Sequence, residues 1–133
     1  MSQVSNALRN LVRERARNRC EYCLLPEVFI VAHEPDHVIA MQHRGMTSTE
    51  NLALACFDCN RRKGPNISSV DPETGEIVQL FNPRREAWLE HFRLEGVRII
   101  GRTPVGRATA ELLQFNQAAR VRIREELHKA GRY

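Results

Sequence analysis

"ACFDCNRRKG", residues Ala55–Gly64, is the stretch of sequence that decides the fold. Two of its cysteines are separated by two residues, an asparagine follows directly, and three basic residues precede a glycine. A C-x-x-C turn points both sulfurs at one place, and a second such turn can complete a tetrahedral shell of thiolates. The stretch is therefore half of a metal site, part of a catalytic site, or both, and the choice depends on what precedes it.

A second C-x-x-C pair, "CEYC", stands upstream. The four cysteines of the chain are Cys20, Cys23, Cys56 and Cys59. The segment Leu24–Ala55 between the pairs is longer than the roughly 15–20 residues of a usual zinc ribbon, so a sizeable insert separates the two turns. A redox C-x-x-C needs a βαβ context, which this sequence does not show. We expect one structural Zn²⁺ held by all four thiolates, a closed site that supports the fold and does no chemistry.

Length and charge restrict the class of protein. The 133 residues are 42 % hydrophobic, enough for one small domain that a metal ion would help to stabilise. The net charge of +4 favours an anionic partner, of which nucleic acid is the commonest. No apolar run approaches the roughly 18 residues of a membrane span, and the charged N-terminus lacks a signal core. We therefore expect a cytoplasmic protein with reduced cysteines and no membrane partner.

The insert between the cysteine pairs has a coarse secondary-structure pattern. Val28–Ala32 is apolar and β-branched, which predicts a strand, and Val38–Met41 predicts a second. The histidines and acids between them, among them Asp36 and His37, are expected at a strand end or bend. "HRGMTSTEN" is typical of a loop, and "LALACFDCNRRKG" of the entry into a short helix. The order strand, strand, helix predicts a ββα unit clasped by the two cysteine pairs.

Asp36-His37, Asn51 and Asn60, in this order inside the four-cysteine frame, resemble the motif of the HNH endonucleases. The resemblance covers about Cys20–Gly64 and includes "CEYC", "DHV", "TENLALAC" and "CNRRKG", here in an Asp-His/Asn/Asn form. It implies a ββα-metal fold and hydrolysis of DNA phosphodiesters to 5′-phosphate and 3′-hydroxyl ends. The last motif position is often a second metal-binding histidine in this family, and here it is Asn60.

The chemistry assigns roles to these residues. A neutral imidazole can take a proton from water near neutral pH, so His37 is the expected general base. The resemblance implies that Asp36 and Asn60 hold one catalytic metal ion, and their oxygen ligands favour Mg²⁺ or Mn²⁺. Asn51 would tie the intervening loop by side-chain hydrogen bonds and so orient the base. Because neighbouring strand residues point to opposite faces, a bend is expected where Asp36 and His37 serve one site.

Basic residues surround this motif. Arg61, Arg62 and Lys63 are expected to contact phosphate oxygens near the cut, with duplex DNA as the partner. A basic helix is expected over Ser5–Arg17, with an apolar stripe packed on the zinc module and arginines that either line DNA or face solvent. The core would span about residues 18–66 and an extension about residues 67–133, within a single HNH nuclease domain over residues 1–133. That extension is either a support or a clamp on DNA outside the cut.

The extension carries several local signals. We expect a strand over Ile77–Phe81, a helix capped by Asn82, a strand over Val97–Ile100 and a helix opening at Thr103-Pro104. A last helix, capped by Asn116, would turn its arginines either to solvent or to the backbone of duplex DNA. The whole is an α+β fold: a ββα-metal core stapled by a four-cysteine zinc site, with an N-terminal helix and a helical C-terminal extension. The alternative to a nuclease is a zinc-stapled nucleic-acid-binding module that does not cleave.

Overall fold

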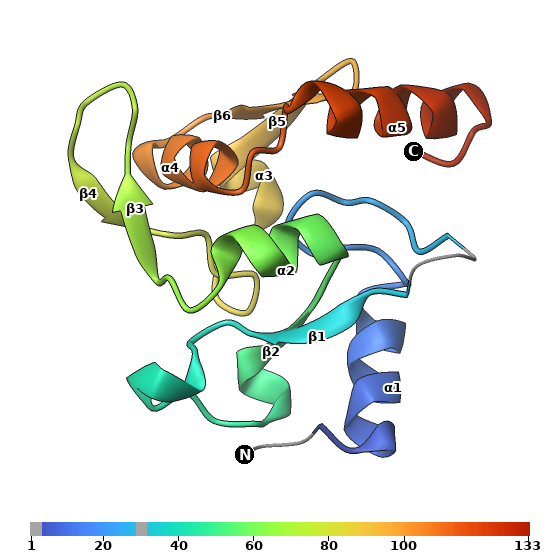
Figure 1. The fold of residues 1–133 in the computed structure, drawn as a ribbon, viewed down its shortest axis with the longest axis vertical. Coiled ribbons are helices and arrows are strands. Elements are labelled where there is room, and N and C mark those ends of the chain that lie inside the picture. Colours follow the sequence, from blue (N-terminus) through green and yellow to red (C-terminus); the bar gives the residue numbers. More distant parts are fainter. Residues whose placement is uncertain (1–3, 29–31) are drawn as a thin grey trace.

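The computed structural model describes residues 4–28 and 32–133 (Figure 1). In chain order the elements are α1 (Asn6–Arg15), β1 (Glu34–His37), η1 (Met41–His43), η2 (Thr49–Asn51), β2 (Leu52–Ala55), α2 (Phe57–Lys63), β3 (Ser68–Val70), β4 (Ile77–Gln79), α3 (Trp88–His91), β5 (Phe92–Glu95), β6 (Arg98–Gly101), α4 (Pro104–Leu112) and α5 (Ala118–Lys129). The strands form small antiparallel two-stranded sheets, so the fold class is α+β, as predicted. None of the described helices has the length and apolar character needed to cross a membrane.

The ββα unit is formed by β1, β2 and α2. Strand β1 pairs antiparallel with β2, and Asp36 lies opposite Ala53 while His37 lies opposite Leu52. All four residues of β2 are buried, which fixes the position of this strand in the core. Helix α2 follows at once, with Cys56 as its N-cap and Gly64, at φ 50°, as its C-cap. Two strands and a helix are present in the predicted order, but the strands are not the predicted ones.

The strand boundaries differ from the sequence prediction. Of the expected strand Val28–Ala32, residues 29–31 lie outside the described part of the chain. Val38–Met41 is not a strand, because the chain bends after His37 and enters η1. Asp36 and His37 lie within β1 itself, and Leu52–Ala55 is the partner strand rather than the entry into a helix. Pairing with the fully buried β2 decides these boundaries.

Helix α1 packs on the β1–β2 pair. Its Val12 is fully buried against Leu52 and Leu54, with Leu8 at the edge of this cluster. Three of its arginines contact neighbouring segments: Arg9 pairs with Glu34, Arg13 with Glu27, and Arg15 donates to the backbone carbonyls of Thr49 and Leu52. The sequence left open whether the arginines of this helix line DNA or face solvent. Neither role describes these three side chains, because they hold neighbouring segments in place.

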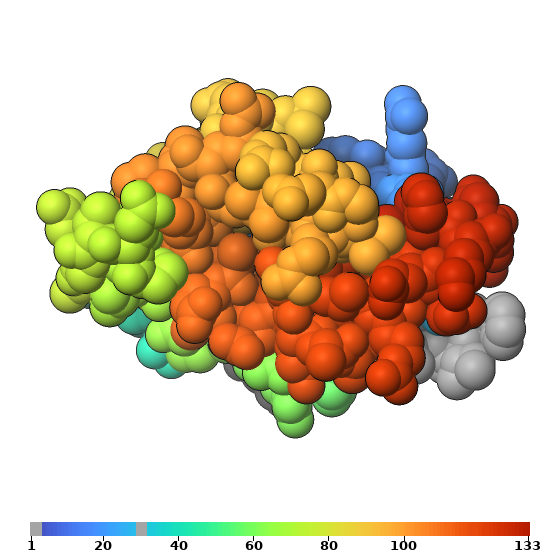
Figure 2. Space-filling view, turned by 90° about the horizontal axis from the view of Figure 1, so that it is seen from above, coloured from blue at the N-terminus to red at the C-terminus, as the bar shows by residue number. Residues whose placement is uncertain are grey.

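The residues after α2 build a second half that shares its core with the ββα unit. Helix α2 lies between the β1–β2 pair and the C-terminal elements, and Figure 2 shows the face that those elements form. One apolar cluster joins both halves; it contains Cys20, Tyr22, Cys23, Val38, Ala53, Ala55, Cys56, Cys59, Phe81, Phe92, Ile99, Leu113 and Phe115. Successive rings meet edge to face, as Phe92 does with Phe81 and Phe115.

Two asparagines in this half act differently from the prediction. Asn82 does not cap a long helix: its side chain accepts a hydrogen bond from the Arg84 amide within a turn, and helix α3 covers only Trp88–His91. Asn116 does not cap α5, because its side chain binds both backbone groups of Ile99 in β6. The helix opening at Thr103-Pro104 is confirmed, with the Thr103 hydroxyl accepting from the Gly106 amide.

The arginines of α5 are also not all solvated. Arg120 and Arg124 are 5 % and 2 % exposed, so they belong to the interior. Arg124 donates to the carbonyl of Val97 and stands over the ring of Tyr133. The expectation of a wholly solvated arginine face is therefore wrong, since the helix turns these two cations toward the core.

Candidate active site and four-cysteine centre

Four buried cysteines form a metal-binding centre at the junction of the two halves. The cysteines are free thiols, and their sulfurs all lie within 4.8 Å of one another. Cys23 Sγ and Cys56 Sγ are 3.7 Å apart. Four Zn–S bonds of about 2.3 Å in a tetrahedron put sulfurs about 3.8 Å apart, so the cluster fits Zn²⁺. In each pair the second cysteine donates its amide to the sulfur of the first, which fixes the two turns.

The charges of this centre depend on one another. Burial raises the pKa of the Cys20 and Cys59 thiols, while hydrogen bonding to Cys20 lowers the pKa of Cys23 and Cys56. Without a metal ion, Cys20 and Cys59 therefore keep their protons more readily than Cys23 and Cys56. All four sulfurs can be thiolates only when a cation balances their charge. The guanidinium of Arg120 supplies one positive charge: burial works to lower the pKa of Arg120, but the nearby cysteine charges raise it above its usual range.

The C-terminal half closes around the first cysteine turn. The indole of Trp88 donates to the carbonyl of Tyr22 at 2.8 Å, and the hydroxyl of Tyr133 donates to the carbonyl of Cys23 at 2.8 Å. These contacts come from segments far along the chain. They fix the backbone of the turn that presents Cys20 and Cys23 to the other pair.

A separate open hollow of about 420 Å³ brings together three of the residues singled out from the sequence. Asp36 and His37 reach it from β1 and Asn60 from α2, and Met41 and Gly64 lie on its rim. The expected bend between Asp36 and His37 is absent, because β1 continues through both residues and the chain bends only after them. Residues that are neighbours in a strand nevertheless line one hollow.

Asp36 is 6 % exposed and is held by two side chains that sequence reasoning missed. The Tyr22 hydroxyl donates to Asp36 Oδ2 at 2.9 Å, and the Lys63 ammonium lies 3.1 Å from the same oxygen. Burial raises the pKa of Asp36, while Lys63 and Tyr22 act against that rise. Two signals could have found them: Tyr22 stands between two cysteines, and Lys63 follows Asn60 by three residues, on the same side of a helix.

The donors left in the hollow suit a hard cation. From the described residues, no hydrogen bond reaches Asp36 Oδ1 or the side chain of Asn60. A carboxylate oxygen and an amide oxygen are ligands that Mg²⁺ accepts, usually together with waters and substrate phosphate. The residues present therefore fit one such ion.

Hydrogen bonds from the loop between the strands hold His37 and its surroundings. The Nε2 atom of His37 lies 2.9 Å from the hydroxyl oxygen of Thr47. Asn51 accepts from the Ile39 amide and donates to the carbonyls of Ile39 and Met46. A Cβ at Gly45 would lie 1.6 Å from the Ile39 oxygen, so this close approach requires glycine.

The comparison with known families agrees with this arrangement. Residues 20–66 match the model of the HNH endonuclease family. This segment is therefore similar to HNH endonuclease domains. The HNH match contains both cysteine pairs, both strands of the ββα unit and α2, and the resemblance stated from sequence is confirmed. No curated protein and no solved structure matches the chain. The HNH domain indicates nuclease or nucleic-acid-related activity, and the four cysteines support zinc as its structural ion.

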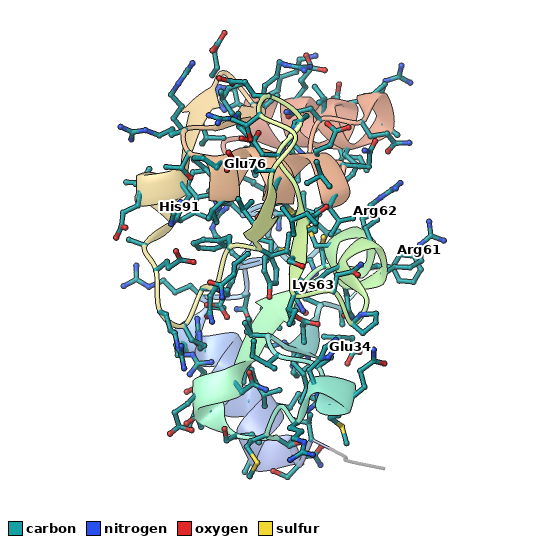
Figure 3. The ribbon with its side chains drawn as sticks, turned by 90° about the vertical axis from the view of Figure 1, so that its left-hand side faces the viewer. Glu34, Arg61, Arg62, Lys63, Glu76 and His91 are labelled. Carbon is teal, nitrogen blue, oxygen red and sulfur yellow. The ribbon has the colours of Figure 1, made fainter. Side chains whose placement is uncertain are left out.

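The basic residues after the HNH asparagine face different directions. Arg61 is exposed and stands over the ring of Phe57 at 5.6 Å, and Arg62 is half-buried. Figure 3 shows Arg61 and Arg62 pointing outward from α2 while Lys63 lies inside. Lys63 is 1 % exposed and its ammonium is bound to Asp36 and to the carbonyl of His37. This burial conflicts with a surface contact between Lys63 and phosphate.

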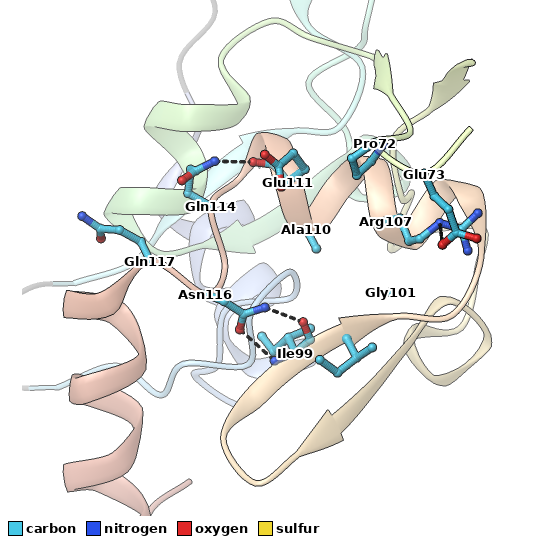
Figure 4. Close-up of a pocket in the computed structure, with 11 residues that line it drawn as sticks. Pro72, Glu73, Ile99, Gly101, Arg107, Ala110, Glu111, Gln114, Asn116 and Gln117 are labelled. Atoms are coloured by element: carbon cyan, nitrogen blue, oxygen red, sulfur yellow. Dashed lines mark hydrogen bonds and ion pairs between the residues drawn. The ribbon is translucent and has the colours of Figure 1, made fainter. Parts of the chain in front are cut away.

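A second hollow, of about 460 Å³, lies outside the HNH domain between β6 and α4 (Figure 4). Two of its polar side chains are already engaged. Asn116 binds the backbone of Ile99, and Arg107 pairs with Asp71 and with Glu73. The described residues that line this hollow include no histidine, whereas those of the HNH hollow include an acid, a histidine and an amide side chain.

Proposed function

We propose that this protein is a metal-dependent endonuclease that hydrolyses phosphodiester bonds of DNA and leaves 5′-phosphate and 3′-hydroxyl ends. The observation that supports it is the meeting of Asp36, His37 and Asn60 at one open polar hollow within the HNH segment. An acid, a proton acceptor and an amide oxygen at one solvent-open place are what metal-assisted attack of water on a phosphodiester needs. A protein that only binds nucleic acid needs no such set.

His37 is the general base of this reaction. Its Nε2 has the Thr47 hydroxyl as a partner, at 2.9 Å. When that nitrogen carries its proton and donates to Thr47, the other nitrogen, Nδ1, has the lone pair that accepts the proton of water. Asn51 binds both sides of the loop that carries Thr47, so it keeps the imidazole in one orientation.

Asp36 and Asn60 hold the single catalytic Mg²⁺ or Mn²⁺ through Asp36 Oδ1 and the amide oxygen. When bound, such an ion neutralises charge on the phosphoryl oxygen and on the departing 3′ oxygen. Tyr22 and Lys63 fix Asp36 Oδ2 and thereby fix the direction of Oδ1. The four-cysteine centre holds Zn²⁺ as a structural ion, because four protein ligands leave no open position for chemistry.

Duplex DNA is the proposed partner, and the cytoplasm the proposed location. The net charge of +4 attracts a polyanion, and Arg61 and Arg62 are positioned on the outer side of α2 to contact its backbone. Lys63 does not belong to these DNA-contacting residues, because its buried ammonium pairs with Asp36. The chain acts as one nuclease unit, with the C-terminal half as a support for the cysteine centre rather than as a clamp on DNA.

A cleavage assay tests the proposal directly. Zinc-loaded wild type, His37→Ala and His43→Ala are incubated with supercoiled plasmid in EDTA, Mg²⁺ or Mn²⁺. His43 ends η1 and is exposed, so it controls for loss of a loop histidine. We expect nicked or linear product that needs metal and disappears only in His37→Ala. A folded wild type that binds but never cuts DNA would instead favour the non-cleaving binding module.

A further inference from the structure

The proposed metal ligand Asp36 forms a buried ion pair with Lys63. Lys63 Nζ is 3.1 Å from Asp36 Oδ2, and the two side chains are 2 % and 6 % exposed. The same ammonium donates to the carbonyl of His37 at 3.1 Å. Two acceptors from β1 therefore hold the cation, and its burial leaves it no solvated position to move to while the domain stays folded.

This pair leaves the hollow without net negative charge. Asp36 is the one acidic side chain that lines the hollow in the described part of the chain, and Asn60 is neutral. A bare divalent ion is attracted to a protein site mainly by negative ligands, and sites with fewer of them bind more weakly. The Lys63 charge cancels that of Asp36, so the free protein offers two oxygen donors but no net electrostatic attraction for the ion.

A phosphodiester would supply what the hollow lacks. Each phosphate brings one negative charge and oxygen ligands, and Mg²⁺ commonly binds through one or two carboxylates plus substrate phosphate. The ion in turn reduces the desolvation cost of placing a phosphate beside Asp36. Two ligands that strengthen each other at one site do so by the same factor in both directions.

We propose that the catalytic metal ion and the substrate phosphate bind this site together, each strengthening the other, because Lys63 cancels the charge of Asp36. This inference rests on the proposed function and adds that the ion and the DNA depend on each other for firm binding. The metal ion is held weakly by the free protein and firmly by the complex with DNA. The buried ion pair thereby keeps the site from retaining a metal ion until a phosphodiester is present.

The experiment measures the coupling from both directions. It uses zinc-loaded His37→Ala, which leaves Asp36, Asn60 and Lys63 in place and prevents cleavage. Mn²⁺ affinity of the free protein and of its complex with an unlabelled duplex is measured by electron paramagnetic resonance, after subtraction of the Mn²⁺ that the duplex binds alone. Affinity for a fluorescent DNA duplex is measured by anisotropy at fixed ionic strength, with and without Mn²⁺. We expect Mn²⁺ to tighten duplex binding by about tenfold or more, within the usual range of coupling between two ligands.

Two further variants in the same background test the cause. Lys63→Met removes the cation with similar volume, and we expect Mn²⁺ affinity of the free protein to rise about tenfold and the coupling to shrink. Lys129→Met removes the same charge from an exposed lysine on α5, and should leave both the Mn²⁺ affinity and the coupling unchanged. Circular dichroism and zinc content confirm that each variant is folded.

The outcomes separate this inference from the proposed function. Firm Mn²⁺ binding by the free protein that DNA does not change overturns the inference, even if metal-dependent cleavage by wild type is observed. Absence of Mn²⁺ binding with and without DNA, together with absence of cleavage by wild type, overturns the metal site itself. If Lys63→Met fails to fold, the coupling measured in His37→Ala, which keeps Lys63, still decides whether the metal ion and DNA bind together.

Discussion

Arg120 in α5 donates a hydrogen bond from its guanidinium to the sulfur of Cys59 at 3.0 Å. A second contact, at 3.8 Å, reaches Cys56, and the other end of the guanidinium binds the carbonyls of Leu113 and Gln114. A centre of four thiolates around Zn²⁺ carries two net negative charges, so a buried cation that donates to sulfur stabilises it. The C-terminal half thus contributes to the metal centre as well as to the core.

Replacing this arginine should loosen the metal. In Arg120→Met we expect zinc affinity, measured by competition with a chromogenic chelator, to fall by about 10- to 100-fold, as for other residues that hydrogen-bond a metal ligand. The thiols should also react faster with an alkylating reagent. Arg122→Met is the matched control, since Arg122 is exposed on the same helix. Equal zinc affinity in the two variants would contradict the role given to Arg120.

Asn51 should support the loop beside His37. In Asn51→Ala the half-buried amide and carbonyl of Ile39 lose their partner, and each lost hydrogen bond costs roughly 0.5–1.5 kcal/mol. We expect a lower Tm by calorimetry and slower plasmid cleavage with unchanged zinc content. Asn66→Ala, at an exposed position after α2, serves as the control. Wild-type Tm and cleavage in Asn51→Ala would show that the loop holds its shape without this side chain.

Thr47 should set the proton position on His37. Thr47→Val removes the hydroxyl that lies 2.9 Å from His37 Nε2 while keeping the shape of the side chain. We expect kcat to fall by about 10- to 100-fold, in keeping with the contribution of an oriented general base, and KM to change little. Thr47→Ser retains the hydroxyl and should retain most of the rate. A Val variant as fast as the Ser variant would refute this contact as a determinant of catalysis.

Asp71 should stabilise the second half through Arg107. The carboxylate is fully buried and accepts two hydrogen bonds from the guanidinium, at 2.9 and 2.8 Å, which hold the pKa of Asp71 well below its usual range. Because folding lowers this pKa, the contribution to stability is complete above the ordinary value of about 3.9 and is lost as the pH falls below it.

The variant Asp71→Asn should therefore lower Tm by several degrees, and the difference from wild type should stay constant between pH 8 and pH 5. Thermal unfolding followed by circular dichroism at several pH values measures this difference. Glu95→Gln, which removes an exposed partner of Arg93, should change Tm very little. A Tm difference for Asp71→Asn that already shrinks between pH 8 and pH 5 would contradict a lowered pKa in the folded protein as its cause.

Spacing and local signals predicted much of this fold. The two C-x-x-C pairs predicted the four-cysteine cluster, because the geometry of such a turn is local. The N-terminal helix and the Thr103-Pro104 helix start were also readable, since each rests on a pattern within a few residues. The placement of Asp36, His37 and Asn60 around one hollow agrees with the motif order.

The rest depends on contacts between distant segments. Strand β1 contains Pro35 and charged residues, which local propensity disfavours, and only its pairing with buried β2 makes it a strand. Burial of Lys63 and Arg120 could not be predicted, because lysine and arginine are almost never fully buried without partners and the partners lie in other elements. The same reason hid Tyr22 as the residue that holds Asp36.

The distance along the chain between the cysteines and α5 has a consequence for synthesis. Both cysteine pairs leave the ribosome before α5, whose Arg120 and Arg124 close the centre. At roughly 5–20 residues per second, the interval between Cys59 and Arg124 lasts about 3 to 13 seconds. We expect a metal ion to enter the sulfurs during this interval, while solvent still reaches them. Once α5 has packed, Arg120 covers the buried sulfurs, and we expect metal exchange to stay slow until the helix unpacks. The cysteine pairs would then determine when the ion is bound, and α5 how long it is kept.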